Sequence, residues 1–463
     1  MAEVGELFPK AQSRQLSIKT VIPDALASRS MKINPWIRHP RAAATITKTD
    51  SDYQVLIPSG IRKPTILEVA AISSYPRTFK WNADAWARIG NSVPPLFMRA
   101  IAANIRAKMF GGEPLTTKEV DYPAILEEAW QQHLAPRVPD APTVISLFAG
   151  CGGSSLGYSM AGYRELLAVE WDDNAVATFK LNFPDVPVYH GDIGKLSVEQ
   201  CLSMTGLQPG ELDVLDGSPP CQGFSTAGKR DFNDDRNQLF REYVRLLRGL
   251  RPKVFVMENV SGMVKGKMKL IFAEILRELK ASGYKVSARL MNAMYFHVPQ
   301  SRQRMIFIGV REDLAAEPGH PKAESVPVTV REALCGIEKL PGKPPTDGTK
   351  IAECCRIMKQ GQTASDFYQQ NWGFNLYRLA WDKVAPTFTK GGGACGLIHP
   401  ELPRKCVKAE YQAVMSYTRQ FRFAGTEEEA RERIGNSVPP LFMRAIARHI
   451  LATILTPPPA SLS

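Results

Sequence analysis

The sequence predicts an α/β fold in which a mostly parallel sheet is covered by helices and is followed by a smaller, less regular domain. Between about residues 144 and 310, short apolar runs alternate with segments whose apolar residues recur at helical spacing. Such alternation is typical of parallel strands joined by helices. Beyond about residue 311 the pattern gives way to proline-, glycine- and lysine-rich sequence, such as LPGKPPTDGTK at 340–350. This change favours a second domain with little regular structure.

The predicted strands and helices follow one another along the first of these regions. The strand candidates are the apolar runs VISLFAG (144–150), LLAVEW (166–171), DVLDG (213–217), KVFVMENV (253–260) and RMIFIGV (304–310). The helix candidates are the segments 155–163, 237–250 and 269–283. The carboxyl ends of parallel strands meet at one edge of a sheet, where open α/β folds bind their ligands. Polar residues at those ends are therefore candidate site residues.

Composition and charge narrow the class of protein. Of 463 residues, 44% are apolar and 22% are charged, which is ordinary for a globular chain of two or three domains. The net charge of +12 and the pI near 9.2 favour a polyanionic partner, without separating nucleic acid from an acidic protein. We expect an intracellular protein that is not membrane-bound, because the sequence has no long apolar run and no secretory signal at its N-terminus. The eight cysteines lack CxxC spacing and nearby histidines, which predicts reduced thiols and no metal site.

One internal repeat brackets this whole region. RIGNSVPPLFMRAIA occurs at 88–102 and again at 433–447, and these fifteen consecutive identities cannot arise by chance. Upstream of each block a weaker likeness continues, and segment 62–79 aligns with 404–421. The two copies therefore span roughly 41–108 and 383–453.

Features at three successive strand ends predict a binding site for an adenosine-like ligand. Phe148-Ala149-Gly150-Cys151-Gly152-Gly153 follows the first strand, where glycines let the backbone approach a ligand, although a plain tight turn has the same composition. Glu170 stands about twenty residues on, where a carboxylate accepts hydrogen bonds from ribose hydroxyls. Trp171 suits either an adenine face or the core, and Asp192 is placed to reach an adenine amino group. Because no GKS/T phosphate loop is present, an adenosine without a phosphate chain fits better than ATP.

The segment Ser218-Pro219-Pro220-Cys221-Gln222-Gly223-Phe224-Ser225 predicts a cysteine nucleophile. The two prolines favour an extended loop after a strand, where a buried structural cysteine would be unexpected. A cysteine reacts as its thiolate, so covalent chemistry needs a partner acid and a positive surround. Glu258, in ENV, ends the next strand and supplies the acid, and QSRQR adds Arg302 and Arg304 as the positive surround, although each arginine alone also suits a phosphate contact or a structural ion pair.

Taken together, these motifs resemble one enzyme family. FAGCGG, PPCQGFS, ENV, QSRQR and GNSVPP occur in the order typical of the DNA (cytosine-5) methyltransferases of the bacterial restriction-modification type, and the resemblance covers essentially residues 141–453. It implies a Rossmann-like, S-adenosyl-L-methionine-dependent core with a small target-recognition domain. It also implies that the activity is that of a DNA (cytosine-5-)-methyltransferase.

The resemblance assigns roles to the catalytic candidates. Cys221 would attack carbon 6 of cytosine, Glu258 would hold or protonate ring nitrogen 3, and Arg302 and Arg304 would secure the substrate. Because carbon 6 is buried in the duplex, the target base must be flipped out of the stack. The implied DNA contacts are Gln222, Ser225, Thr389 and Lys390, with Thr387 and Gly391–Gly393 as further candidates.

The resemblance also carries over a set of cofactor-binding residues. These are Phe148, Gly150, Gly152, Glu170, Trp171, Asp192, Ile193, Pro219, Leu239, Asn436, Ser437 and Val438. One departure is Ser146, where the family often has an acidic residue, and it weakens any assignment of a polar contact at that position.

The expected domains are a partial duplicate (1–125), the catalytic core (141–325), the target-recognition domain (326–405) and C-terminal motifs that return to the core (406–455). The duplicate lacks the cysteine and glutamate motifs, so it is not a second catalytic unit. Three interpretations remain open: a remnant of a tandem fusion, a structural accessory, or a replacement for the C-terminal copy as in circularly permuted relatives. We favour Asn436 over its rival Asn91 because its copy follows a complete series of motifs.

The expected role is protection of double-stranded DNA from a cognate restriction endonuclease, a functional rather than physical partner. The expected enzyme is a cytoplasmic, nucleoid-associated monomer. Two alternatives stay open. One is an RNA-modifying relative, although the Cys-Phe-Thr signature of such members is missing. The other is a catalytically silent DNA-binding protein, against which the intact Cys221, Glu258 and Arg302 argue.

Overall fold

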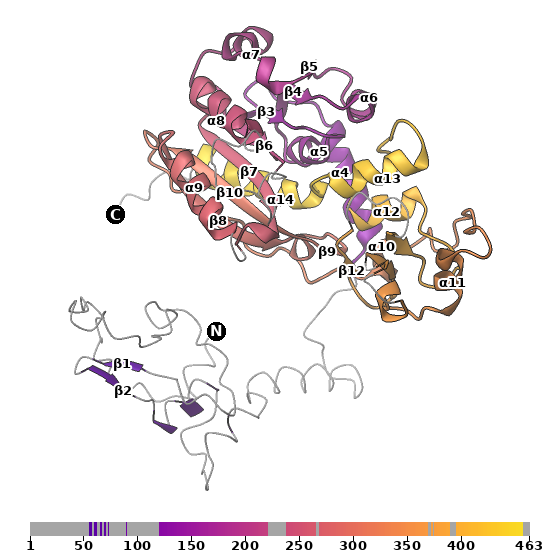
Figure 1. The fold of residues 1–463 in the computed structure, drawn as a ribbon. Coiled ribbons are helices and arrows are strands. Elements are labelled where there is room, and N and C mark those ends of the chain that lie inside the picture. Colours follow the sequence, from indigo (N-terminus) through magenta and orange to yellow (C-terminus); the bar gives the residue numbers. More distant parts are fainter. Residues whose placement is uncertain are drawn as a thin grey trace. The chain divides into compact units, whose positions relative to one another are not determined.

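The structure is a computed structural model of the chain, drawn in Figure 1. It describes residues 120–220, 238–264, 268–368, 372–373, 375–388 and 395–456, together with short pieces between residues 55 and 89. The chain divides into two units, Met1–Lys118 and Glu119–Ser463. In the first unit, β1 (Val55–Ile57) and β2 (Gly60–Arg62) form an antiparallel hairpin in which Ile57 pairs with Gly60.

A seven-stranded sheet forms the centre of the second unit. In spatial order its strands are β5 (Val188–His190), β4 (Arg164–Glu170), β3 (Thr143–Leu147), β6 (Val214–Gly217), β7 (Val254–Val260), β10 (Gln303–Arg311) and β8 (Tyr284–Asn292). The first five strands are parallel, whereas β10 runs antiparallel to both β7 and β8. The predicted α/β fold with a mostly parallel sheet is confirmed.

Helices cover both faces of this sheet (Figure 1). The helices of the second unit are α4 (Tyr122–Leu134), α5 (Gly153–Met160), α6 (Asp173–Asn182), α7 (Val198–Thr205), α8 (Gln238–Leu250), α9 (Met268–Lys280), α10 (Val330–Ala333), α11 (Lys350–Ile357), α12 (Lys408–Val414), α13 (Glu427–Asn436) and α14 (Pro440–Ile450). Alternate strand residues enter different cores: Val254 and Val256 of β7 pack in the cluster that contains α5 and α14, while Phe255 packs in the cluster that contains α8 and α9. Successive side chains of a strand point to opposite faces of the sheet, and both faces are buried here. The central strands are therefore apolar at every position and appear in the sequence as continuous apolar runs.

All five predicted strand runs form, as does β5, the strand expected before Asp192, but the sequence did not predict β8. Strand β8 lies at the edge of the sheet, and most of its side chains are only partly buried. Its sequence, YKVSARLMN, therefore lacks the apolar run that marks the central strands.

The region after β10 has little regular structure, as predicted. Within it, β11 (Leu376–Arg378) pairs in parallel with β13 (Gly396–Ile398), and its strand β12 (Ala385–Pro386) pairs in parallel with β9 (Gln300–Ser301). Because β9 directly precedes β10 of the central sheet, the β9–β12 pair joins this region to the core. A small hydrophobic cluster of its own includes Cys354, Cys355 and Met358.

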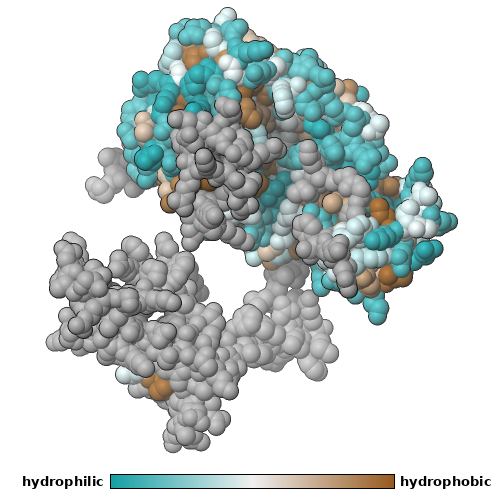
Figure 2. All heavy atoms as spheres, in the orientation of Figure 1, coloured by the Kyte–Doolittle hydropathy of each residue, from teal (hydrophilic) through white to brown (hydrophobic). Residues whose placement is uncertain are grey.

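The C-terminal helices return to the central sheet. The stretch Glu427–Leu455 is apolar and long enough to cross a membrane by composition, but 67% of its most apolar window is buried inside the fold. It is interrupted after α13 by Ser437 and Pro439, and α14 then packs against α5. We therefore assign this stretch to the protein core. On the face drawn in Figure 2, the described surface is mainly hydrophilic with scattered hydrophobic residues.

Candidate active site

The carboxyl ends of β3, β4, β6 and β7 meet at one edge of the sheet because these strands are parallel. The chain leaves β3 through a turn in which Phe148, Gly150 and Gly152 all have positive φ angles, of 56°, 57° and 94°. A Cβ atom on Gly150 would meet nothing within 4 Å, so the backbone there faces open space. Helix α5 begins directly after this turn, at Gly153. This is the close-approach geometry that the glycine-rich sequence predicted.

Glu170, at the end of β4, is tied to the glycine turn. One carboxylate oxygen accepts a hydrogen bond from the backbone N–H of Gly150 at 2.8 Å, and the other accepts from the N–H groups of Trp171 and Asp172 at 2.9 and 3.0 Å. These three bonds fix the carboxylate while leaving acceptor capacity for a ligand. The Trp171 side chain beside it is 78% exposed, which excludes the core position that the sequence left open.

Asp192 starts the short 3-10 turn η3 (Ile193–Lys195) after β5. Its carboxylate accepts a hydrogen bond from the backbone N–H of Gly194 at 2.9 Å, and Ile193 is buried beneath the turn. Leu239, in the first turn of α8, is partly buried against the same hydrophobic cluster as Ile193. Asp192 and Ile193 therefore lie just beyond the end of β5, and Leu239 packs against the hydrophobic cluster that includes Ile193.

The segment that leads to the predicted nucleophile is held by β7. The side-chain amide of Asn259 donates a hydrogen bond to the backbone carbonyl of Pro219 at 3.2 Å, and both residues are buried. Pro220 is the last described residue before Cys221. Cys221, Gln222 and Ser225, as well as the predicted DNA contacts Thr389, Lys390 and Gly391–Gly393, lie outside the described residues.

Glu258 and Arg304 form an ion pair at this edge. The Arg304 Nε atom lies 2.7 Å from a Glu258 carboxylate oxygen, and the two side chains are only 11% and 12% exposed. The pairing of β7 with β10 places Ile306 opposite Glu258, so Arg304 is its diagonal neighbour on the same face of the sheet. The hydrogen bond between the two charged groups fixes the orientation of the Glu258 carboxylate and of the Arg304 guanidinium.

Arg302 occupies a different environment from Arg304. Its guanidinium is 2% exposed and donates to the backbone carbonyls of Phe388, at 3.2 Å, and Gly435, at 3.1 Å. Burial, together with the neighbouring Arg304 charge, lowers the pKa of Arg302 to about 9. Arg302 therefore links the region after β10 to the last motif, and the structure brings Arg304 rather than Arg302 into contact with Glu258. Nearby, the exposed Thr387 hydroxyl donates to the Ser301 carbonyl at 2.6 Å.

The last motif packs on the first one. A Cβ atom on Gly153 would lie 2.4 Å from the Val438 carbonyl oxygen and 3.0 Å from the Ser437 Cβ atom, so only glycine allows this approach. The Ser437 hydroxyl donates to the Ile434 carbonyl at 2.8 Å, while Asn436 at the end of α13 is exposed. In the second unit, the C-terminal copy of the repeat is thus the one that borders the glycine turn.

Two contacts at this junction involve residues that the sequence did not single out. Arg433 forms an ion pair with Asp172 at 3.0 Å, and the buried hydroxyl of Tyr417 lies 3.3 Å from the Cys151 sulfur. Burial raises the pKa of the Cys151 thiol to about 11. Arg433 and Tyr417 both recur in the N-terminal copy, as Arg88 and Tyr75, which was the one available signal. Among the described residues, no group of three His, Cys, Asp or Glu side chains is arranged to hold a metal ion.

The chain is similar to known proteins of one family. The family described as C-5 cytosine-specific DNA methylase matches residues 142–452. The Type II methyltransferase M1.HphI of Haemophilus parahaemolyticus is 34% identical over 67% of this chain and 86% of its own length. The Type II methyltransferase M.XorII of Xanthomonas oryzae is 32% identical over 68% of this chain and 86% of its own length.

Solved structures share the fold. A prophage-encoded protein of Escherichia coli, described as a DNA modification methyltransferase, is 26% identical with a TM-score of 0.56, covering 67% of this chain and 99% of its own. The Spodoptera frugiperda protein DNMT2, at 18% identity and a TM-score of 0.50, covers 67% of this chain and 100% of its own, and shows the likeness of the fold alone.

Proposed function

We propose, from the premise that this chain belongs to the C-5 cytosine-specific DNA methylases, that it methylates carbon 5 of cytosine within one short duplex sequence through a covalent adduct on Cys221. The observation that carries the proposal is the buried Glu258–Arg304 pair at the sheet edge, on the strand whose Asn259 holds the segment leading to Cys221. The acid Glu258, the cation Arg304 and the segment leading to Cys221 thus come from the neighbouring strands β7, β10 and β6. A reaction at a cytosine ring needs an acid and a nucleophile close together.

The proposed chemistry begins with the Cys221 sulfur. Its thiolate forms a bond to carbon 6 of cytosine, and electron density moves to carbon 5, which becomes nucleophilic. Glu258, oriented by Arg304 at 2.7 Å, holds ring nitrogen 3 and limits the charge that builds up on the ring. Once carbon 5 carries the methyl group, loss of its proton to a base and cleavage of the bond between sulfur and carbon 6 restore the aromatic ring and release the thiolate. The base must leave the duplex stack for this attack, at a cost of about a few kcal/mol.

The cofactor proposed for this site is S-adenosyl-L-methionine, which supplies an electrophilic methyl group when bound. The open space at Gly150, the fixed carboxylate of Glu170 and the exposed ring of Trp171 fit an adenosine moiety without phosphates. Asp192 and Ile193 would hold the adenine. The remaining residues proposed to contact the cofactor are Phe148, Gly152, Pro219, Leu239, Asn436, Ser437 and Val438.

We further propose that the C-terminal copy of the repeat, with Asn436, closes the cofactor pocket. Two residues that differ between the copies, outside the fifteen identical residues, support this proposal. Arg448 donates to the Gln132 side chain of α4 at 2.9 Å, and the Tyr411 hydroxyl accepts from the Leu397 N–H at 2.7 Å. The N-terminal copy has alanine and valine at the corresponding positions 103 and 69, and neither side chain forms such bonds.

The biological role that we propose is protection of DNA from a cognate restriction endonuclease, as a cytoplasmic, nucleoid-associated monomer. The similarity to two Type II methyltransferases supports this context. The recognition region after β10, joined to the core through β9 and β12, would read the target sequence in the major groove.

The test is methyl transfer from tritiated S-adenosylmethionine to duplex DNA and, in parallel, to transfer RNA, followed by bisulfite sequencing of the DNA. Label on duplex cytosines within one short motif is expected. Cys221→Ser should abolish transfer while leaving DNA binding measurable, whereas Cys335→Ser, a control on an exposed thiol, should remain active. Label only on RNA, or turnover by the Cys221 variant, would contradict the proposal.

A further inference from the structure

Helix α8 holds the turn that bears Asp192 through a single arginine. The Nη2 atom of Arg245 donates to the carbonyls of Ile193, at 3.1 Å, and Leu196, at 2.8 Å. Its Nε atom binds the Glu242 carboxylate at 2.7 Å. Glu242 is mostly buried, at 17% exposure, so the carboxylate fixes the direction in which the guanidinium points.

Arg245 donates its hydrogen bonds at the C-terminal end of the turn η3. The Ile193 carbonyl already accepts a hydrogen bond from the Leu196 N–H at 3.2 Å, and Arg245 adds a second donor to it and a donor to the Leu196 carbonyl at the C-terminal end of the turn. At the other end, the Asp192 carboxylate caps the turn by accepting from the Gly194 N–H at 2.9 Å. The position of the Asp192 carboxylate is therefore set by its own cap and by Arg245.

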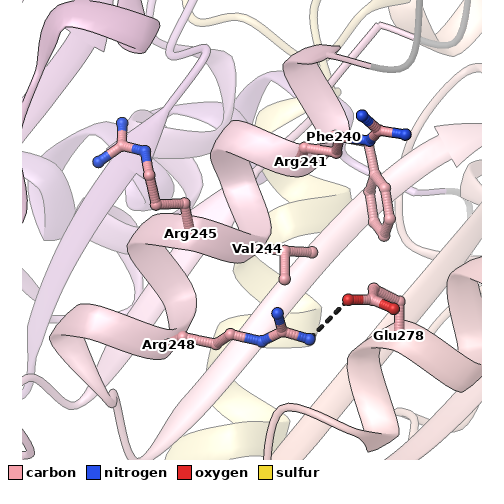
Figure 3. Close-up of a pocket in the computed structure, with 6 residues that line it drawn as sticks. All are labelled: Phe240, Arg241, Val244, Arg245, Arg248 and Glu278. Atoms are coloured by element: carbon pink, nitrogen blue, oxygen red, sulfur yellow. Dashed lines mark hydrogen bonds and ion pairs between the residues drawn. The ribbon is translucent and has the colours of Figure 1, made fainter. Parts of the chain in front are cut away.

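A neighbouring arginine on the same helix has a different task. Arg248 donates to the Glu278 carboxylate at 2.6 Å and to the Ser282 hydroxyl at 3.0 Å, and so joins α8 to α9. Arg245 and Arg248 both border a surface hollow of about 460 Å³ between these two helices. Figure 3 shows that Arg245 points away from the Arg248–Glu278 pair. The two side chains have the same chemistry but different partners: Arg245 bonds to η3, whereas Arg248 bonds to α9.

We propose that Arg245 is a positioning residue for cofactor recognition, which holds η3 so that Asp192 meets the amino group of adenine. This inference rests on the proposed S-adenosylmethionine site. Helix α8 begins at Gln238, on the C-terminal side of the segment that contains Cys221, and carries Leu239 in its first turn. Arg245 thus joins η3, the turn proposed to bind adenine, to α8, the helix that follows the segment containing Cys221.

The test measures binding rather than turnover. Calorimetry gives the affinities of the full chain for S-adenosylhomocysteine and for S-inosylhomocysteine, in which an oxo group replaces the adenine amino group. The wild type should prefer the adenosyl compound. Arg245→Met should weaken the binding of S-adenosylhomocysteine by about tenfold, because a displaced Asp192 carboxylate loses its hydrogen bond with the adenine amino group. The variant should also show a smaller preference for the adenosyl compound over the inosyl compound. Arg245→Lys should recover part of both.

Arg248→Met is the matched control, and it should keep the wild-type affinities and preference. An Arg245→Met variant with unchanged affinity, or with both compounds weakened equally, would overturn the positioning role. If the wild type binds neither compound, the proposed cofactor itself is wrong, and this outcome is distinct from a failure confined to the Arg245 variant.

Discussion

Glu258 and Arg304 show how two nearly buried charges depend on each other. Removing one partner of such a pair leaves the other charge buried and uncompensated, which costs about 3–5 kcal/mol in typical cases. The short contact of 2.7 Å therefore serves stability as well as orientation. Arg302 differs because both of its Nη atoms donate to backbone carbonyls, and its loss would disturb the junction between two regions.

Glu258→Gln keeps the shape of the side chain but removes its charge and its capacity to protonate a ring nitrogen. We expect the single-turnover methylation rate to fall by about 10²- to 10⁴-fold, the range for general acid–base groups. Lys253→Met, which breaks the Lys253–Asp213 pair at the start of β7, should leave that rate nearly unchanged. Equal rates for the wild type and Glu258→Gln would show that the carboxylate has no part in the reaction.

The carboxyl of Asp216 in β6 is fully enclosed, close to Glu165 in β4. Burial, with a contribution from Glu165, raises the pKa of Asp216 from 3.8 to about 8. The folded protein thus holds this proton more tightly than the unfolded chain, so its contribution to stability is complete below about pH 4 and is lost as the pH rises towards 8.

Asp216→Asn removes this titration while it keeps a neutral polar side chain. Relative to the wild type, the variant should gain about 2 kcal/mol of unfolding free energy between about pH 6 and about pH 9, measured by urea denaturation. Glu165→Gln should show the same trend to a smaller extent, because burial raises the pKa of Glu165 to about 7. Parallel pH profiles for the wild type and both variants would rule out this account.

At the scale of elements, the contact between α5 and α14 depends on the absence of a side chain. A Cβ atom on Gly157 would lie 2.6 Å from the Pro440 carbonyl oxygen and 2.8 Å from the Arg444 nitrogen, and these are backbone atoms that cannot rotate away. The two helices therefore touch at close range, which joins the first and last motifs into one body.

Gly157→Ala should force α5 and α14 apart. We expect a loss of about 1–3 kcal/mol in unfolding free energy, the usual cost of overpacking, even though alanine favours a helix more than glycine does. Gly262→Ala is the matched control, since its added Cβ atom would meet nothing within 4 Å. Urea midpoints for the two variants measure the difference, and a Gly157 variant as stable as the control would refute the tight contact.

At the scale of the whole molecule, the boundary between the two units suggests which part is dispensable. The first unit ends at Lys118, and the family match begins at residue 142. Between them, α4 belongs to the second unit: the Tyr122 hydroxyl donates to the Ala413 carbonyl at 2.8 Å, and its side chain is fully buried.

Removing residues 1–118 should leave a folded protein whose methylation rate is within about twofold of the full chain, because the C-terminal copy keeps its contacts with α5. Removing residues 1–134 also deletes α4 and should lower the thermal midpoint by several degrees, since a buried tyrosine and its hydrogen bond are lost. Thermal melting and methyl transfer measure both truncations. A folded but inactive 119–463 fragment would favour the permuted arrangement, in which the N-terminal copy completes the site.

The central strands were predictable because each is buried on both faces and reads as an apolar run. Strand β8 was not, since an edge strand with half-exposed side chains carries no such pattern. Glu258 and Arg304 were predictable as strand-end residues, but their pairing was not. It depends on the register of β7 and β10, strands that are about fifty residues apart in the chain.

The sequence by itself determined the family, the order of its motifs and the residue types at each strand end, because these are properties of local pattern. Only the tertiary structure decided that Arg304 meets Glu258, that Arg302 bonds to backbone carbonyls, and that the C-terminal copy lies against α5. The two copies of the repeat are identical over fifteen residues, so no local pattern separates them. They differ in partners such as Gln132, which only folding brings within hydrogen-bonding distance of Arg448.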